Sequence, residues 1–222
     1  MTESYKTVLE AGRDEFTVSH SRFIGWSKPV DTEEGALRFI EEIRKTHWDA
    51  AHNVWAYVLG SARERFSDDG EPQGTAGIPV LEVIRKEGLR DVAVVVTRYF
   101  GGIKLGAGGL VRAYTQGAKI ALEAGKIIQR LPYLSRYVHT EYSLTGKFQR
   151  EFAQRGYILK DTTYLEQVAF TVLIPPAEEE NLQKLVAELT AGQGRLQPGP
   201  MEYLDFWQGE IIMKPGNHQR SE

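Results

Sequence analysis

The sequence contains no cysteine, and this absence removes several kinds of chemistry at once. Disulfide bonds, thiolate nucleophiles and metal sites built on cysteine are all excluded. No stretch approaches the roughly 18 consecutive apolar residues of a membrane-spanning helix. The first residues, Met1 to Lys6, lack the charged and apolar regions of a signal peptide. We therefore expect a cytoplasmic protein that has no membrane partner.

Several signatures of nucleotide-binding proteins and hydrolases are also missing. The sequence has no Walker A loop, no G-x-S-x-G serine elbow and no complete metal-ligand pattern. Gly106 and Gly108 are followed by Val111, where a dinucleotide-binding fingerprint needs a third glycine or an alanine. We therefore expect no catalytic residue, no cofactor, no bound metal and no intrinsic hydrolase or transferase activity.

The net charge of −3 does not suggest nucleic-acid binding, but the basic residues are distributed unevenly. Residues 85–130 contain nine Lys or Arg and three Asp or Glu, whereas residues 132–222 contain nine and twelve. A basic patch on one half of the chain is what contact with backbone phosphates requires. A solvated, charged helix face would give the same composition.

The most informative segment runs from Arg98 to Arg112 and reads RYFGGIKLGAGGLVR. Such a density of glycine indicates positive φ angles or the close approach of another group. Because the N–H groups and the dipole at a helix start attract anions, the segment suggests phosphate contact. Glycines that serve packing alone are the alternative. The candidate anion- or nucleic-acid-binding residues are Arg98, Tyr99, Gly101, Gly102, Lys104, Gly106, Gly108, Gly109 and Arg112.

A second candidate region is the acidic, glycine-containing segment that follows Ser67. Its grouped carboxylates could bind a metal or act as acid and base, but the same residue types are also ordinary turn formers. A further structural option is that they pair with Arg98 or Lys104. The residues of this possible partner-binding or structural loop are His52, Asn53, Asp68, Asp69, Gly70, Glu71, Pro72, Gly74 and Thr75.

Hydrophobic periodicity and capping residues predict the elements of the N-terminal half. The strands are expected at Phe16–Trp26, Asn53–Leu59 and Val92–Arg98. The helices are expected from Asp31–Glu34 to Thr46, at Thr75–Glu87 and at Leu110–Ala124, with a long loop over Ser61–Gly77.

A domain boundary is expected near Gln129–Tyr133. Beyond it, the order strand, helix, strand, strand, helix, strand is that of the ferredoxin-like βαββαβ unit. Its elements are predicted at Arg136–Leu144, Lys147–Arg155, Tyr157–Tyr164, Glu166–Ile174, Ala177–Thr190 and Gly199–Gln208. We therefore predict an α/β (α+β) chain with domains at residues 1–130 and 133–210 and a tail at residues 211–222.

Four sequence blocks resemble the signature of the YigZ/IMPACT family. These blocks are Ser21–Gly25, Ala51–Tyr57, Ser67–Pro79 and Arg98–Tyr114. The resemblance implies a bacterial two-domain member, with an N-terminal domain like the second domain of ribosomal protein S5 and a ferredoxin-like C-terminal domain. It also implies a link to translation, since eukaryotic relatives restrain a starvation-sensing kinase pathway by binding its ribosome-associated activator.

We therefore expect a non-catalytic, translation- or stress-linked regulator that binds RNA, DNA or the ribosome through its basic, glycine-rich surface. A translation-associated protein is a further candidate partner. One alternative is a metal-assisted hydrolase that uses His52, Asp68, Asp69 and Glu71. Another is a protein-docking module that uses the same surface.

Overall fold

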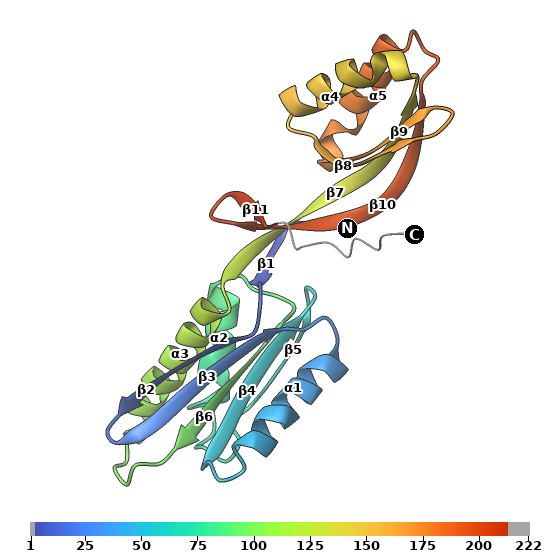
Figure 1. The fold of residues 1–222 in the computed structure, drawn as a ribbon. Helices are drawn as coiled ribbons and strands as arrows, with labels where there is room; N and C mark the ends of the chain where they lie inside the picture. The colour runs from blue at the N-terminus through green and yellow to red at the C-terminus, as the bar shows by residue number, and fades with distance from the viewer. Residues whose placement is uncertain (1–2, 213–222) are drawn as a thin grey trace. The chain divides into compact units, whose positions relative to one another are not determined.

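The structure, a computed structural model, describes residues 3–212 and contains two compact units (Figure 1). One unit comprises Tyr5–Arg130 with Asp205–Ile211, and the other consists chiefly of Leu131–Leu204. The strands form two separate sheets, and helices pack on both of them. The expected α+β class is confirmed.

The N-terminal unit is built on a five-stranded antiparallel sheet in the order β2-β3-β6-β4-β5. The pairing of His52 with Arg98 places the start of β4 opposite the end of β6. This end of the sheet carries the candidate site. The strands are β2 (Gly12–Val18), β3 (Ser21–Pro29), β4 (His52–Leu59), β5 (Arg63–Ser67) and β6 (Val92–Tyr99).

Helices cover both faces of this sheet (Figure 1). Helix α1 (Glu33–Thr46) packs on one face, and α2 (Gly77–Lys86) and α3 (Gly106–Ala124) pack on the other. The central strand β6 is therefore buried on both sides. Val94 joins the core under α2 and α3, whereas Val95 joins the core under α1. This explains why Val92–Val96 of β6 are all apolar instead of alternating with polar residues.

The single strand predicted at Phe16–Trp26 is wrong, because two strands of a hairpin share this segment. Strand β2 ends at Val18, and β3 begins at Ser21. Between them, Ser19 and His20 have φ angles of 46° and 63°. Tight two-residue hairpin turns need this left-handed backbone. No glycine or asparagine marks the turn in the sequence.

The bounds of other elements in the N-terminal unit were also compared with those predicted from the sequence, and two of them differ. The predicted loop Ser61–Gly77 contains the edge strand β5, whose first residues are exposed. Helix α3 begins at Gly106 instead of Leu110, so its first turn includes glycines, which are poor helix formers and for that reason indicated a loop. Helix α1 begins where predicted, and the Thr32 side chain accepts a hydrogen bond from the Gly35 N–H.

The C-terminal part begins with a long strand, β7 (Ile127–Thr140). Strand β1 (Tyr5–Val8) pairs with the first residues of β7, from Ile127 to Arg130. The boundary between the two compact units falls after Arg130 and thus lies inside β7. Pro132 does not interrupt the strand.

The predicted βαββαβ order is confirmed in the second unit, where β7 is followed by α4, β8, β9, α5 and β10. The sheet order β10-β7-β9-β8 places the first and third strands of this unit in its centre. Phenylalanines of α4 and leucines of α5 pack on one face of the sheet. The elements are α4 (Thr145–Gln154), β8 (Ile158–Tyr164), β9 (Val168–Ile174), α5 (Glu179–Leu189) and β10 (Arg195–Trp207).

A further short strand, β11 (Glu210–Ile212), pairs with β10. The predicted tail at residues 211–222 therefore begins inside a strand. Residues 213–222 lie outside the described residues.

Candidate nucleic-acid interface

A buried ion pair between Arg98 and Glu71 lies at the centre of the candidate site. Arg98 is near the end of β6, and Glu71 lies in the loop between β5 and α2. Arg98 Nη1 donates to Glu71 Oε1 at 2.7 Å, and the two side chains are only 6% and 4% exposed. A buried charge is costly unless it is paired. The pair therefore fixes the acidic loop to the sheet. Pairing of the loop carboxylates with Arg98 was one of the options that the sequence left open.

Glu71 also connects the loop to α3 and β4. The hydroxyl of the fully buried Tyr114 donates to Glu71 Oε1 at 2.7 Å. Burial, followed by the negative charge of Glu71, raises the pKa of Tyr114, so this hydroxyl stays protonated. His52 Nε2 lies 3.8 Å from the same oxygen. Glu71 thus holds together segments that are far apart in the chain.

Aromatic rings and a serine surround the guanidinium of Arg98. Its centre lies 5.5 Å from the Phe23 ring and 5.4 Å from the Phe100 ring, within the range of cation–π contacts. Ser21 Oγ lies 3.5 Å from Arg98 Nη2 and accepts the Gly101 N–H at 3.2 Å. The β2–β3 hairpin therefore contacts both Arg98 and the glycine-rich segment.

The Asp68 carboxylate caps helix α2. It accepts the backbone N–H groups of Gly74 at 2.9 Å, Ala76 at 3.2 Å and Gly77 at 2.8 Å. Carboxylates at helix starts commonly bind these otherwise unpaired N–H groups. The Thr75 hydroxyl donates to the Pro72 carbonyl at 2.7 Å, and Gly74 has a φ of 77°. These contacts are those of a structural turn.

Asp69 faces α1 and β4. Its carboxylate accepts from Arg44 at 2.7 Å and from the Asn53 N–H at 2.6 Å. His52 Nδ1 lies 2.8 Å from the Asp69 carbonyl oxygen, which can only accept, so Nδ1 carries the proton. Asp69 and Gly70 both have positive φ, at 45° and 85°. The backbone turns sharply here, and the carboxylates of the loop point to separate partners.

The separate partners of these side chains argue against the proposed metal site. Asp68, Asp69, Glu71 and His52 are neighbours, but their side chains do not converge on one point. Among residues 3–212, no group of three or more His, Asp or Glu side chains could hold a metal ion.

The segment after Arg98 forms an exposed loop at residues 100–105, which we call the glycine loop, and it leads into α3. Gly102 and Gly106 have φ angles of 86° and 69°, so the predicted need for positive φ is confirmed. At Gly101, an added Cβ would lie 2.0 Å from the His20 carbonyl carbon, so only glycine fits there. Gly108 and Gly109 belong to the first turns of α3.

The start of α3 is open to solvent and carries positive side chains. Leu105 supplies no side-chain cap, and the first turn contains no acidic residue. Lys104 and Arg112 are exposed, and neither forms an ion pair with any of the described residues. An added Cβ on Gly108 would lie 3.7 Å from Arg112 Nη1, so this guanidinium lies beside the helix start. The free N–H groups and these cations give the surface a positive potential.

Tyr99 is half-buried and faces the α1 side of the sheet. Its hydroxyl donates to Asp49 at 3.0 Å and lies 2.9 Å from His47 Nδ1. Burial, together with Asp49, raises the pKa of Tyr99. Of the predicted binding residues, Arg98 and Tyr99 therefore make internal contacts, whereas Lys104 and Arg112 face solvent.

The sequence did not predict the hydrogen bonds of Tyr114 and Ser21, although both residues lie in the signature blocks. A signal existed for Tyr114, because its hydroxyl interrupts the apolar stripe of α3 that includes Leu110 and Ala118. A buried tyrosine usually needs a hydrogen-bond partner. Ser21 gave no comparable signal.

None of the helices within residues 3–212 is long and apolar enough to cross a membrane.

Two domain families match the chain in the order of the two units. Residues 19–122 match the Impact N-terminal domain, and residues 138–193 match a domain of unknown function, DUF1949. The solved structures include a similar chain, described as the crystal structure of a hypothetical protein. It aligns with a TM-score of 0.58 and 31% identity, over 90% of this chain and 99% of that chain.

Among curated proteins, the IMPACT family member YvyE of Bacillus subtilis (strain 168) is 43% identical over 209 residues. These cover 92% of this chain and 95% of YvyE. The IMPACT family member YigZ of Escherichia coli (strain K12) is 33% identical over 183 residues, which cover 81% of this chain and 90% of YigZ. The fold and these matches define a two-domain α+β protein with an Impact N-terminal domain. The chain belongs to the IMPACT family.

Proposed function

We propose that this protein is a non-catalytic, cytoplasmic regulator linked to translation or stress, which binds RNA, DNA or the ribosome. The binding surface is the glycine loop together with the first turns of α3. The family resemblance supports the link to translation. The surface itself supports a ligand rich in phosphate.

The observation that carries this proposal is the uncapped start of α3 beside two cations, Lys104 and Arg112, that form no ion pair with the described residues. Neighbouring α2 begins with its N–H groups bound by Asp68, whereas α3 has no such carboxylate. Uncapped N–H groups, the positive end of a long helix and exposed basic side chains are suited to phosphate oxygens. Lys119, also exposed on α3, extends the basic surface along the helix.

Arg98 has a different role in this proposal from the one its charge suggests. Its positive charge is neutralised by Glu71, and only 6% of its side chain is exposed. It therefore holds the acidic loop and Phe100 in place, and the glycine loop follows directly. The direct phosphate contacts fall to Lys104, Arg112 and backbone N–H groups.

Fluorescence anisotropy with a fluorescein-labelled, single-stranded RNA of mixed sequence tests this proposal. Binding is measured at several salt concentrations for the unmodified protein and for the double variant Lys104→Ala/Arg112→Ala. Each lost phosphate contact lowers the slope of log K against log salt by about 0.7 for single strands. We expect the double variant to bind more weakly and to lose about 1.4 from the slope.

The matched control is Arg38→Ala/Lys45→Ala, which removes two exposed cations from α1. It changes the net charge equally but leaves the glycine loop intact. Equal slopes for the two double variants, or no RNA binding at low salt, would contradict the proposal. A labelled DNA strand and purified ribosomal subunits, assayed in the same way, identify the preferred phosphate-rich ligand.

The metal-assisted hydrolase has no comparable support. Each carboxylate of the acidic loop already has its own protein partner: N–H groups for Asp68, Arg44 for Asp69 and Arg98 for Glu71. No observation therefore favours this alternative.

A further inference from the structure

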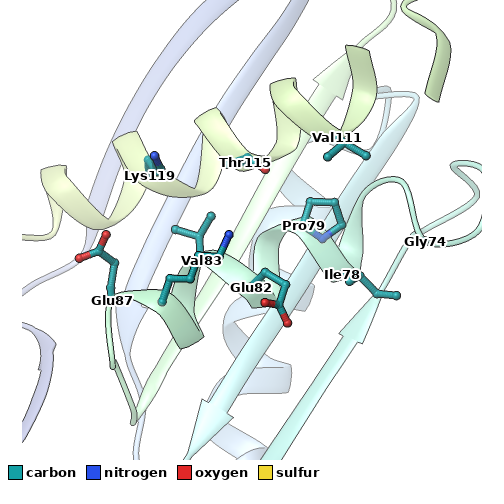
Figure 2. A pocket seen from close by; sticks show the side chains of 10 residues that line it. Gly74, Ile78, Pro79, Glu82, Val83, Glu87, Val111, Thr115 and Lys119 are labelled. Atoms are coloured by element: carbon teal, nitrogen blue, oxygen red, sulfur yellow. The ribbon is translucent and has the colours of Figure 1, made fainter. Parts of the chain in front are cut away.

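The N-terminal unit has a groove of about 400 Å³ between α2 and α3 (Figure 2). Two carboxylates, those of Glu82 and Glu87, line this groove together with two lysines, Lys86 and Lys119. The charges of the groove are therefore balanced. Because Lys119 also belongs to the basic surface described above, the groove indicates no ligand of its own.

The C-terminal unit contains a cavity of about 550 Å³ with a different lining. It lies at the end of the sheet where β7 stops at Thr140 and β9 starts at Val168. The hairpin between β8 and β9, the end of α5 and the start of β10 contribute the other walls. Sites for small molecules typically have volumes of about 300–1,000 Å³, so this cavity has room for one.

Thr140 brings an unused hydrogen-bonding group to the lining of this cavity. The residue is only 4% exposed, and its hydroxyl has no hydrogen-bond partner among residues 3–212. The hydroxyl of Thr190, which lines the same cavity, is satisfied: it donates to the Val186 carbonyl at 2.6 Å and accepts the Gly194 N–H at 2.7 Å. A buried hydroxyl without a partner is costly. A polar ligand in the cavity would supply the missing partner of Thr140.

The charged groups that line the cavity are two carboxylates and one guanidinium. Glu141, Glu188 and Arg195 are exposed, and none of them forms an ion pair with any residue in the described part of the chain. Helix α5 ends at this cavity without a basic residue in its last turn. The end of a helix carries a partial negative charge. The cavity therefore has a surplus of negative charge, with a single cation at Arg195. His139 adds an imidazole that can donate or accept a hydrogen bond.

The charges of the lining are complementary to a ligand with two cations and one carboxylate. Free basic amino acids such as lysine and arginine have this set, since they carry an α-ammonium group, a side-chain cation and an α-carboxylate. The planar guanidinium of Arg195 suits the carboxylate, because it can donate two parallel hydrogen bonds. The two cations match Glu141 and Glu188.

We propose that this cavity of the C-terminal unit binds a free basic amino acid. Arg195 binds the α-carboxylate, Glu141 and Glu188 bind the two cations, and the Thr140 hydroxyl gains a polar partner. The site shares no residue with the glycine loop or with α3. It therefore does not depend on the nucleic-acid surface proposed above.

Isothermal titration calorimetry with the full-length protein tests the proposal. The ligands are L-lysine and L-arginine, together with three compounds that each change one feature. L-norleucine lacks the side-chain cation, cadaverine lacks the carboxylate, and L-glutamate has a side chain of opposite charge. We expect saturable binding of L-lysine or L-arginine. Each of the other three should bind roughly tenfold more weakly or worse, because a charge-assisted hydrogen bond contributes about that factor.

Substitutions of exposed residues then locate the binding site. Glu188→Gln should weaken binding of the basic amino acid roughly tenfold. Arg195→Gln should weaken it by a similar factor but leave the binding of cadaverine unchanged, because cadaverine has no carboxylate to lose. The matched controls are Glu180→Gln and Lys184→Gln, which remove the same charges from exposed positions of α5 outside the cavity.

Thr140→Val tests the unpaired hydroxyl separately, because valine has nearly the same shape as threonine. We expect weaker binding of the basic amino acid, whereas the stability of the ligand-free protein in urea should be unchanged or higher. A merely structural role of the hydroxyl would instead lower that stability.

Several results would overturn the proposal. These are no binding of either L-lysine or L-arginine, equal affinity for L-lysine and L-norleucine, or equal effects of Glu188→Gln and Glu180→Gln. Equal affinity for L-lysine and cadaverine would assign the cavity to simple diamines instead. Binding of L-lysine that survives Lys104→Ala/Arg112→Ala shows that the cavity acts independently of the glycine loop, whereas its loss in that variant would contradict the location proposed here.

Discussion

The Tyr114 hydroxyl and the Arg98 guanidinium bind the same carboxylate oxygen of Glu71, each at 2.7 Å. Tyr114 lies on α3, Arg98 on β6 and Glu71 in the loop before α2. A single oxygen atom thus accepts hydrogen bonds from a helix and a strand that are covalently joined only through the glycine loop. The position of that loop depends on both bonds.

Removing the Tyr114 hydroxyl should destabilise the N-terminal unit without removing the ion pair. We expect Tyr114→Phe to lower the free energy of unfolding by about 1.5–3 kcal/mol, since hydrogen bonds to charged groups contribute about that much. Urea unfolding followed by circular dichroism measures the change. Tyr142→Phe is the comparison, because that tyrosine is 54% exposed. Equal stability of Tyr114→Phe and the unmodified protein would contradict this role.

The ion pair should be far more sensitive to the loss of one partner than to the loss of both. Glu71→Gln leaves Arg98 buried without an opposite charge, and such changes cost about 3–5 kcal/mol. The double variant Glu71→Leu/Arg98→Met removes both charges and should recover part of this loss. Thermal unfolding of the single and double variants tests the coupling. Strict additivity of the two single changes would show that the charges do not interact.

Alanine substitutions at two glycines near the start of α3 should have opposite effects on the stability of the protein. Gly102 has a φ of 86°, which an alanine adopts only with strain, so Gly102→Ala should cost about 1 kcal/mol or more. Gly108 lies inside α3, where alanine is the better helix former and meets only the end of the Arg112 side chain. Gly108→Ala should therefore stabilise by about 0.5–1 kcal/mol. The melting temperatures of the two variants show whether each substitution stabilises or destabilises the protein.

Alkaline pH should destabilise the protein through its buried tyrosines. Burial, and then the hydrogen bond to Glu33, raises the pKa of Tyr57 to about 12. An unfolded tyrosine ionises near pH 10, so the unfolded state loses its proton first. The stabilisation is complete below about pH 10 and declines by up to about 1.4 kcal/mol per pH unit towards pH 12.

Comparison with Tyr57→Phe isolates this contribution. The variant should be less stable than the unmodified protein at pH 8, because the bond to Glu33 is lost. The difference should shrink between pH 10 and 12, since phenylalanine has no proton to lose. Urea unfolding at pH 8, 10, 11 and 12 provides the measurement. A difference that stays constant with pH would show that Tyr57 does not titrate as described.

Local signals in the sequence were enough to predict several elements. Thr32 and the following glutamates located the start of α1, and the apolar run after Asp91 located β6. The order of elements after β7 gave the βαββαβ arrangement. In each case, the pattern depends on neighbours in the chain or on burial of the whole element.

The wrong predictions concern features that strand pairing determines, with no signal from the residue types themselves. Ser19 and His20 adopt left-handed backbone angles because two paired strands force the turn, not because of their residue types. Strand β5 has exposed residues and forms by pairing with β4. Strand β7 continues through Pro132, although proline usually favours a break.

The candidate site could also be predicted only in part from the sequence. Positive charges near Arg98 can be counted from the sequence, but counting cannot tell which of them a ligand meets. Glu71 lies 27 residues before Arg98, and only the fold brings the two side chains together. Lys104 and Arg112 have the same formal charge as Arg98 and remain exposed.

The different starts of α2 and α3 have a consequence for the direction in which a ligand lies. The two helices begin at the same end of the sheet, but Asp68 neutralises the start of α2, whereas the start of α3 is open. The positive electrostatic potential is therefore uneven. It is stronger near the start of α3 than near the start of α2. A bound polyanion would meet a gradient across the surface and not a symmetrical patch, so its phosphates would lie towards the start of α3 and away from the start of α2.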